Sequence, residues 1–172
     1  LDCLDGPTRA FVAGYMTHLL VDETYIFNLF RPFFGNRNVF EDPATGRLLD
    51  RALQLDLDRE VWERVRGLLE NVEFSPERVQ VAFLEQEHLS RWRDWVFEVV
   101  TRGFTWERLR FMARRIVVGG DEQPADELVD DFLNRIPQSL EQIYDVVPQE
   151  SVNDFKAQAV ESSVTAIGDY LE

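Results

Sequence analysis

The apolar residues of this chain recur at spacings of three and four, which is the period of an α-helix. From Pro7 to about Phe34, apolar residues fall on almost every side of a helix, and the strict alternation of a strand is absent. Asp5 and Pro7 suit the start of such a helix. Polar residues, including His18 and Asp22, interrupt its apolar run well short of the roughly 20 residues needed to cross a bilayer. We therefore expect a long, mostly buried core helix.

Further helical patterns follow this first one. Apolar residues from Leu48 onward begin a second pattern, and Asp58 suits the N-terminus of a third. Pro76 suits the start of a fourth helix that reaches about Val100, where Gly103 would end it. Each of these helices has one apolar face, so each is expected to pack on a neighbour.

The clearest internal boundary is a hinge at Gly119 and Gly120, which follows a helix that Thr105 would cap. Beyond it, the spacing predicts an amphipathic helix, a short second helix and a long third helix. We divide the chain into a helical core, residues 1–118, and a C-terminal helical hairpin packed on it, residues 119–172. The expected fold class is all-α, a multi-helix bundle around a buried first helix. The C-terminal helices must pack on that helix or on another copy of the chain.

The composition indicates a single domain of intracellular type. A chain of 172 residues can bury roughly 70% of its unfolded surface. Its single cysteine, Cys3, excludes an internal disulfide. The chain opens at Leu1 with neither a basic start nor an apolar signal core. We expect a cytoplasmic protein whose natural N-terminus is missing from this sequence.

The charge limits the choice of partner. The formal net charge is −14, from 32 acidic and 18 basic residues, and the acidic groups are spread along the helices. Such a field repels nucleic acid and anionic lipid. Four arginines at helical spacing favour an ion-paired, solvated face over a phosphate site: Arg108, Arg110, Arg114 and Arg115. We expect no nucleic-acid partner and no transmembrane segment.

The most informative residues are His18 and Asp22, which lie four apart and therefore share one face of the first helix. Apolar residues continue this stripe on both sides: Phe11, Tyr15, Ile26 and Leu29. One interpretation is that the pair binds a divalent metal, because neutral imidazole nitrogen and carboxylate oxygen are normal zinc ligands. The other is an ion pair that ties this helix to its neighbours. His18 and Asp22 are the candidate metal ligands, and no catalytic residue is assigned.

The remaining patterns carry less chemistry. Glu85 and His88 are interpreted as an exposed or interhelical polar pair, and they stay candidates for distant partners of His18 and Asp22. The sequence has no Gly-rich phosphate loop, no dinucleotide fingerprint and no Gly-x-Ser-x-Gly elbow, so no organic cofactor is expected. Aromatic residues at helical spacing are interpreted as core: Phe27, Phe30, Phe33, Phe34, Trp92, Trp95 and Trp106.

Residues 11–23, Phe-Val-Ala-Gly-Tyr-Met-Thr-His-Leu-Leu-Val-Asp-Glu, contain the pattern Gly-Tyr-x-x-His-x-x-x-Asp. This pattern resembles a helix of bacterial zinc-dependent phospholipase C-like proteins, and residues 104–115 look like the C-terminal region of uncharacterised members of that family. The resemblance implies an all-helical hydrolase of phosphodiesters in phospholipids, with His18 and Asp22 among its zinc ligands. The family's zinc cluster uses several histidines. With only two histidines, this chain would be a fragment that lacks ligands or a relative that has lost them.

Three functional hypotheses follow. The first is a metal-dependent phosphoesterase-like domain in which His18 and Asp22 bind one zinc ion, which activates water for attack on a phospholipid or another phosphodiester. The alternative is a non-catalytic helical interaction or oligomerisation module, whose helices after Gly120 pair with another chain, including a second copy in a homo-oligomer. Binding to a membrane surface is a third hypothesis, which the acidic charge disfavours.

Overall fold

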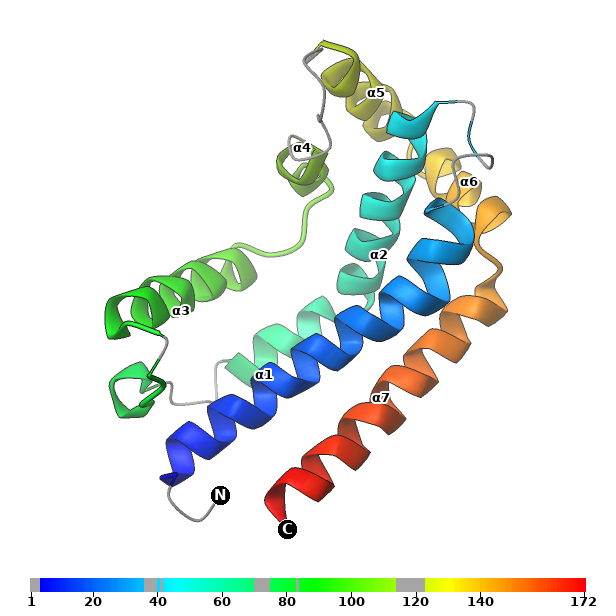
Figure 1. Ribbon diagram of the computed structural model, residues 1–172. Coiled ribbons are helices and arrows are strands. Elements are labelled where there is room, and N and C mark those ends of the chain that lie inside the picture. The colour runs from blue at the N-terminus through cyan, green and yellow to red at the C-terminus, as the bar shows by residue number, and fades with distance from the viewer. Residues whose placement is uncertain (1–3, 36–39, 41, 70–74, 83, 114–122) are drawn as a thin grey trace.

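The computed structural model describes residues 4–35, 40, 42–69, 75–82, 84–113 and 123–172. These ranges are helical and contain no strand, so the predicted all-α fold class is confirmed (Figure 1). A π-helix continues the first α-helix, and a 3-10 turn precedes the third. The elements are α1 (Gly6–Tyr25), η1 (Ile26–Phe34), α2 (Pro43–Leu69), η2 (Pro76–Arg78), α3 (Gln86–Thr101), α4 (Arg108–Ala113), α5 (Gln123–Asn134), α6 (Gln138–Val146) and α7 (Gln149–Leu171).

The first helix begins where the sequence predicts. Asp5 Oδ1 accepts a hydrogen bond of 2.9 Å from the backbone N–H of Thr8, and Pro7 lies in the first turn. The expectation that the helix from Pro7 to about Phe34 is mostly buried is wrong, since Thr8, Leu29 and Phe34 are its only described residues that are buried. The reason is that α7 packs along one side of α1 (Figure 1). Side chains on the rest of its surface line a cleft or are exposed to solvent.

Residues predicted to form two successive helices form the single helix α2. Asp42 caps its start, because its two carboxylate oxygens accept hydrogen bonds of 3.0 Å from the backbone N–H groups of Ala44 and Thr45. Asp58, the predicted N-terminus of a separate helix, lies inside α2, and that prediction is wrong. Residues 50–60 contain neither glycine nor proline, so nothing in the backbone interrupts the helix there.

The helix predicted to start at Pro76 begins instead at Gln86. Pro76 opens only the short turn η2, which ends where Val79 takes up an extended conformation with φ −93° and ψ 123°. α3 ends at Thr101, and Gly103 has a φ of +82°, in the left-handed region that favours glycine. The predicted stop at Gly103 is therefore confirmed.

One apolar core joins η1, α2, α4, α5, α6 and α7. Its buried members come from segments on both sides of the predicted hinge: Leu29, Phe34, Leu48, Leu49, Ala52, Leu53, Leu55, Leu109, Ala113, Val129, Phe132, Ile143, Val147, Val152, Phe155 and Ala159. Gly119 and Gly120, predicted to form that hinge, lie outside the described residues. α3 stands to the side of this core (Figure 1).

The three C-terminal helices follow one another as predicted and pack on earlier helices of the same chain. α5 contacts α4 and α2, α6 contacts α2, and α7 lies along α1 (Figure 1). α7 is antiparallel to α1, because Arg9 Nη2 donates to the carbonyl of Leu171 and the amides of Asn28 and Gln158 are hydrogen-bonded. Among the described helices, none combines the length and the apolar character that crossing a bilayer requires.

Candidate binding cleft

A cleft of about 780 Å³ lies among α1, η1, α2 and α7. Such a volume is within the range of about 300–1,000 Å³ that ligand sites in proteins occupy. Its walls are largely apolar, with one contribution from α4: Val21, Ile26, Phe30, Leu57, Val61, Met112, Phe155, Ala159 and Val160. A concave site with apolar walls and a few polar groups is the general form of a binding site.

The cleft exists because the helices on its two sides are held by different neighbours. α7 packs along α1 on one side. On the other side, α2 packs on α3 and α4. The indole Nε1 of Trp62 donates a hydrogen bond of 3.2 Å to the carbonyl of Val100, which holds the C-terminal half of α2 against the end of α3.

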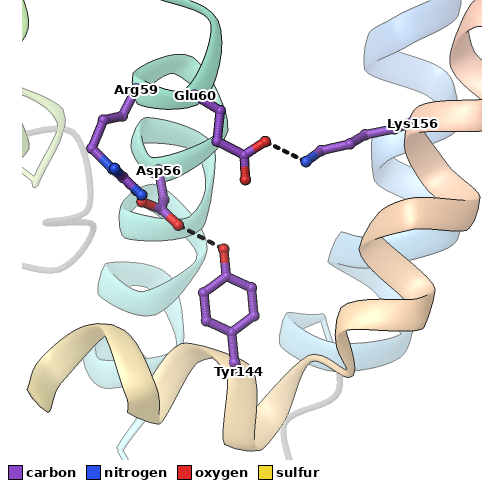
Figure 2. Close-up of polar contacts among 5 residues, drawn as sticks. All are labelled: Asp56, Arg59, Glu60, Tyr144 and Lys156. Carbon is purple, nitrogen blue, oxygen red and sulfur yellow. Dashed lines mark hydrogen bonds and ion pairs between the residues drawn. The ribbon is translucent and has the colours of Figure 1, made fainter. Parts of the chain in front are cut away.

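An ion pair links the two sides of the cleft. Lys156 on α7 reaches across to Glu60 on α2, where its Nζ contacts Glu60 Oε2 (Figure 2). Both side chains are partly exposed, and ion pairs in such positions contribute about 1 kcal/mol or less. The link is therefore weak enough for a competing charged group to replace.

A buried polar network forms one wall of the cleft. Tyr25 donates a hydrogen bond of 2.8 Å to Asp50 Oδ1, and Gln54 Nε2 lies 3.2 Å from both oxygens of the same carboxylate. Arg51 Nη1 in turn donates to Gln54 Oε1 at 2.8 Å. Burial raises the pKa of Asp50 above its ordinary value, and burial next to the Asp50 carboxylate raises the pKa of Tyr25. These groups satisfy one another, so the wall is a structural feature with fixed geometry.

A second buried carboxylate joins α6 to α2. Tyr144 donates a hydrogen bond of 2.6 Å to Asp56 Oδ2, while Arg59 Nε donates at 2.8 Å to Asp56 Oδ1 (Figure 2). The Asp56 residue is only 3% exposed. Burial, followed by the hydrogen bond to Asp56, raises the pKa of Tyr144. This contact fixes α2 on the C-terminal helices close to the cleft.

Sequence reasoning missed Asp50 and Asp56. Both residues lie within the leucine-rich segment Leu48–Leu57, and both share the buried side of α2 with Leu53. An acidic residue at an apolar helical position is the signal that a hydrogen-bonding partner must come from elsewhere in the fold. The partners, Tyr25 and Tyr144, are far away in sequence.

The structure places His18 and Asp22 beside each other, as their spacing predicts. His18 Nε2 lies 3.4 Å from Asp22 Oδ2, and the two side chains are 63% and 58% exposed. Asp22 is among the residues that line the cleft, and His18 is not. Within the described ranges, no three or more His, Cys, Asp or Glu residues come close enough to hold a metal ion. The pair therefore offers two protein ligands.

The second predicted pair is also exposed. Glu85 immediately precedes α3, and its Oε2 lies 3.6 Å from Nδ1 of His88. Since the described part of the chain contains no larger cluster of metal-ligating groups, the structure does not bring this pair together with His18 and Asp22. The structure therefore supports the interpretation of Glu85 and His88 as an exposed polar pair, and not as distant partners of His18 and Asp22.

Several aromatic residues that were interpreted as core are exposed, and that interpretation is wrong for Phe27, Trp92 and Trp95. Phe34 is buried and Trp106 packs against the core, as expected. Five helical elements carry rows of exposed apolar side chains at helical spacing, which we call the apolar rows: Tyr15, Leu19 and Ile26 on α1 and η1, Val61, Val65 and Leu68 on α2, Trp92 and Trp95 on α3, and Val160, Val164 and Leu171 on α7.

The chain exposes more surface than its mass requires. Its accessible surface is 11775 Å² for a mass of 20.1 kDa. A compact folded monomer of this mass exposes about 8,700 Å². The difference of about 3,000 Å² is summed over all 172 residues, including those outside the described ranges.

Comparison with known proteins adds no relative. No family model, curated protein or solved structure matches the chain. The likeness of residues 11–23 to zinc-dependent phospholipase C-like proteins stays a prediction. What bears on function is the geometry of the cleft, the apolar rows and the His18–Asp22 pair.

Proposed function

We propose that this chain is a non-catalytic helical interaction module in which another protein chain covers the cleft and the apolar rows that continue from it on α1 and α2. The observation that carries the proposal is that large apolar side chains stay exposed in rows on the helices that flank the cleft. A standard protein–protein interface removes about 800 Å² from each partner. An interface of this size would cover a small part of the total accessible surface of 11775 Å².

The extent of the apolar rows favours a protein over a small molecule. Ile26, Val61 and Val160 line the cleft, and the rows continue beyond it to exposed residues such as Leu19 and Leu68. A small ligand would fill the cleft and leave the rest of each row in water. Exposed apolar residues that continue along a helix are typical of a surface that another helix or protein covers.

The test is a selection for binding partners that makes no assumption about their charge. The purified chain serves as bait for a phage library of random helical peptides, with Val160→Gln and Val164→Gln as matched variants. Val160 and Val164 are one turn apart on α7 and are 64% and 66% exposed, but only Val160 lines the cleft. We expect enriched peptides to lose about tenfold in affinity, or about 1.4 kcal/mol, on Val160→Gln and to bind Val164→Gln like the parent.

Sedimentation of the parent over a wide range of concentrations accompanies the selection. A doubling of mass that Val160→Gln abolishes would identify a second copy as the covering chain. A strictly monomeric protein that enriches no Val160-sensitive peptide would contradict the interaction-module proposal.

The metal-dependent phosphoesterase is a second proposal, supported by the 3.4 Å approach of His18 Nε2 to Asp22 Oδ2. Imidazole nitrogen and carboxylate oxygen are zinc ligands, and zinc in such a site activates water for attack on a phosphodiester, including that of a phospholipid. Catalytic zinc sites usually have three protein ligands, however, and among the described residues no third His, Cys, Asp or Glu joins this pair. The fit is incomplete, which is why this proposal ranks second.

Elemental analysis of the purified chain tests the phosphoesterase proposal, with His18→Ala and Asp22→Ala measured beside it. Near-stoichiometric zinc that is lost in both variants would support it and justify an assay of phosphodiester hydrolysis. Metal content that stays the same in both variants, or no metal in the parent, would remove it.

A further inference from the structure

We infer that the cleft binds an amphipathic helix whose apolar face is flanked by lysine or arginine side chains. This inference rests on the proposed interaction function and specifies the chemistry of the partner. It depends on the form of the cleft walls and on the charge of the residues around them.

The walls have the form of a groove for a helix. On α2, Leu57 and Val61 are one turn apart. On α7, Phe155 and Ala159 are one turn apart and belong to the buried core, and Val160 beside them is 64% exposed. Each wall therefore has apolar side chains along its helix axis. Ile26 completes the third side. An incoming helix with apolar residues at i, i+3, i+4 and i+7 would pack against all three walls, as helices do in a bundle.

The charged residues around the groove indicate which side chains should flank the apolar face of the incoming helix. Four acidic and two basic residues line the cleft: Asp22, Asp50, Asp58 and Glu60, and Arg51 and Lys156. Asp50 is buried and hydrogen-bonded to Tyr25 and Gln54, so its charge is not available to a partner, and Asp58 also interacts with Arg108. Asp22 and Asp58 are exposed, and Lys156 is already paired with Glu60. Because the whole chain carries a net charge of −14, both the groove and the long-range field favour a basic partner.

The net negative charge of the chain also disfavours two other occupants of the groove, a second copy of the chain and an anionic membrane. A second copy of this chain would bring another −14, and the mutual repulsion would oppose its approach. An anionic membrane would be repelled for the same reason. A lysine or arginine of the incoming helix can instead replace Lys156 as the partner of Glu60 at little cost, because that ion pair is exposed and weak.

Three synthetic peptides of about 14 residues, roughly four helical turns, test the inference. The first has leucine at i, i+3, i+4 and i+7 and lysine at the other positions. The second replaces each lysine by glutamate, and the third has the composition of the first in an order that destroys the apolar face. Binding to the full chain is measured by fluorescence anisotropy at physiological salt concentration.

We expect the leucine–lysine peptide to bind the parent and Val164→Gln equally and Val160→Gln about tenfold more weakly, because a groove side chain is lost without any change in charge. We expect the glutamate peptide and the reordered peptide to bind at least about tenfold more weakly than the first. The Asp22→Asn, Asp58→Asn double variant should lower the affinity of the lysine peptide and its dependence on salt. Circular dichroism checks that the variants keep their helices.

Two results would overturn the inference. If the lysine peptide binds Val160→Gln and Val164→Gln equally, its attraction to the chain is a general charge effect outside the groove. If the glutamate peptide binds as tightly as the lysine peptide, the charge argument is wrong. Enrichment of Val160-sensitive peptides without basic residues in the phage selection would leave the interaction module standing and exclude only the basic helix, whereas enrichment of no such peptide would count against both.

Discussion

Replacement of Tyr144 by phenylalanine removes one hydroxyl from the contact between α6 and α2 and leaves the ring in place (Figure 2). That hydroxyl donates to Asp56 Oδ2 at 2.6 Å, and Asp56 is 3% exposed. The pKa of Tyr144 is raised, so the hydroxyl keeps its proton and donates throughout the neutral range. In the variant, one oxygen of a buried carboxylate loses its donor.

The magnitude follows from the charge and burial of the acceptor. A hydrogen bond to a charged group contributes about 1.5–3 kcal/mol to stability. Asp56 keeps its contact with Arg59, so we expect the free energy of unfolding to fall by about 1.5–2 kcal/mol, toward the lower end of that range. For a chain of this length, that change lowers Tm by about 3–8 °C.

Urea unfolding followed by far-UV circular dichroism measures the change, provided that the transition is two-state. Tyr15→Phe is the matched control, because Tyr15 is exposed on α1, and its free energy of unfolding should stay within about 0.5 kcal/mol of the parent. The double variant with Asp56→Asn gives the coupling between the two side chains. If Tyr144→Phe and Tyr15→Phe have the same urea midpoint as the parent, the hydrogen bond does not hold α6 on α2 and the reasoning is refuted.

Two further predictions concern α2. Leu53→Ala leaves a cavity at a side chain with 0% exposure and should lower the free energy of unfolding by about 2–5 kcal/mol. Leu68→Ala, at 57% exposure on the same helix, is the control and should change it by about 0.5 kcal/mol or less. Urea unfolding measures both changes. Because burial raises the pKa of Asp50 above 3.8, its contribution to stability is full below that pH and is lost as the pH rises through the folded-state pKa. The stability of the parent relative to Asp50→Asn should therefore increase as the pH is lowered toward 4, and parallel pH profiles of the two proteins would contradict this.

The sequence predicts which segments are helical better than it predicts how the helices pack together, because helical spacing is a local property. The long C-terminal helix and the stop at Gly103 are recognisable from nearby residues alone. The wrong predictions of helix boundaries rest on weak local signals, which the neighbouring residues override. Asp58 has the chemistry of a cap, yet the helix-forming residues on both sides continue the helix through it.

Burial depends on which helices meet, and periodicity does not contain that information. Spacing correctly places His18 and Asp22 side by side, but whether their face is covered depends on the side of α1 that α7 occupies. Trp92 and Trp95 share a helical face for the same local reason, and in this fold that face is exposed. The cleft itself combines residues from α1, α2 and α7, so no single segment of the sequence indicates it.

The two proposed functions depend on different side chains that lie close together. Asp22 lines the cleft and is also a candidate zinc ligand, so Asp22→Ala alone cannot separate them. His18 is not among the lining residues, and Val160 has no group that ligates a metal. If both proposals hold, His18→Ala should remove zinc and leave the affinity for the leucine–lysine peptide unchanged. Val160→Gln should leave the zinc content unchanged and lower the affinity for the peptide. Loss of peptide binding in His18→Ala would instead show that the short peptide also contacts the α1 apolar row beyond the cleft.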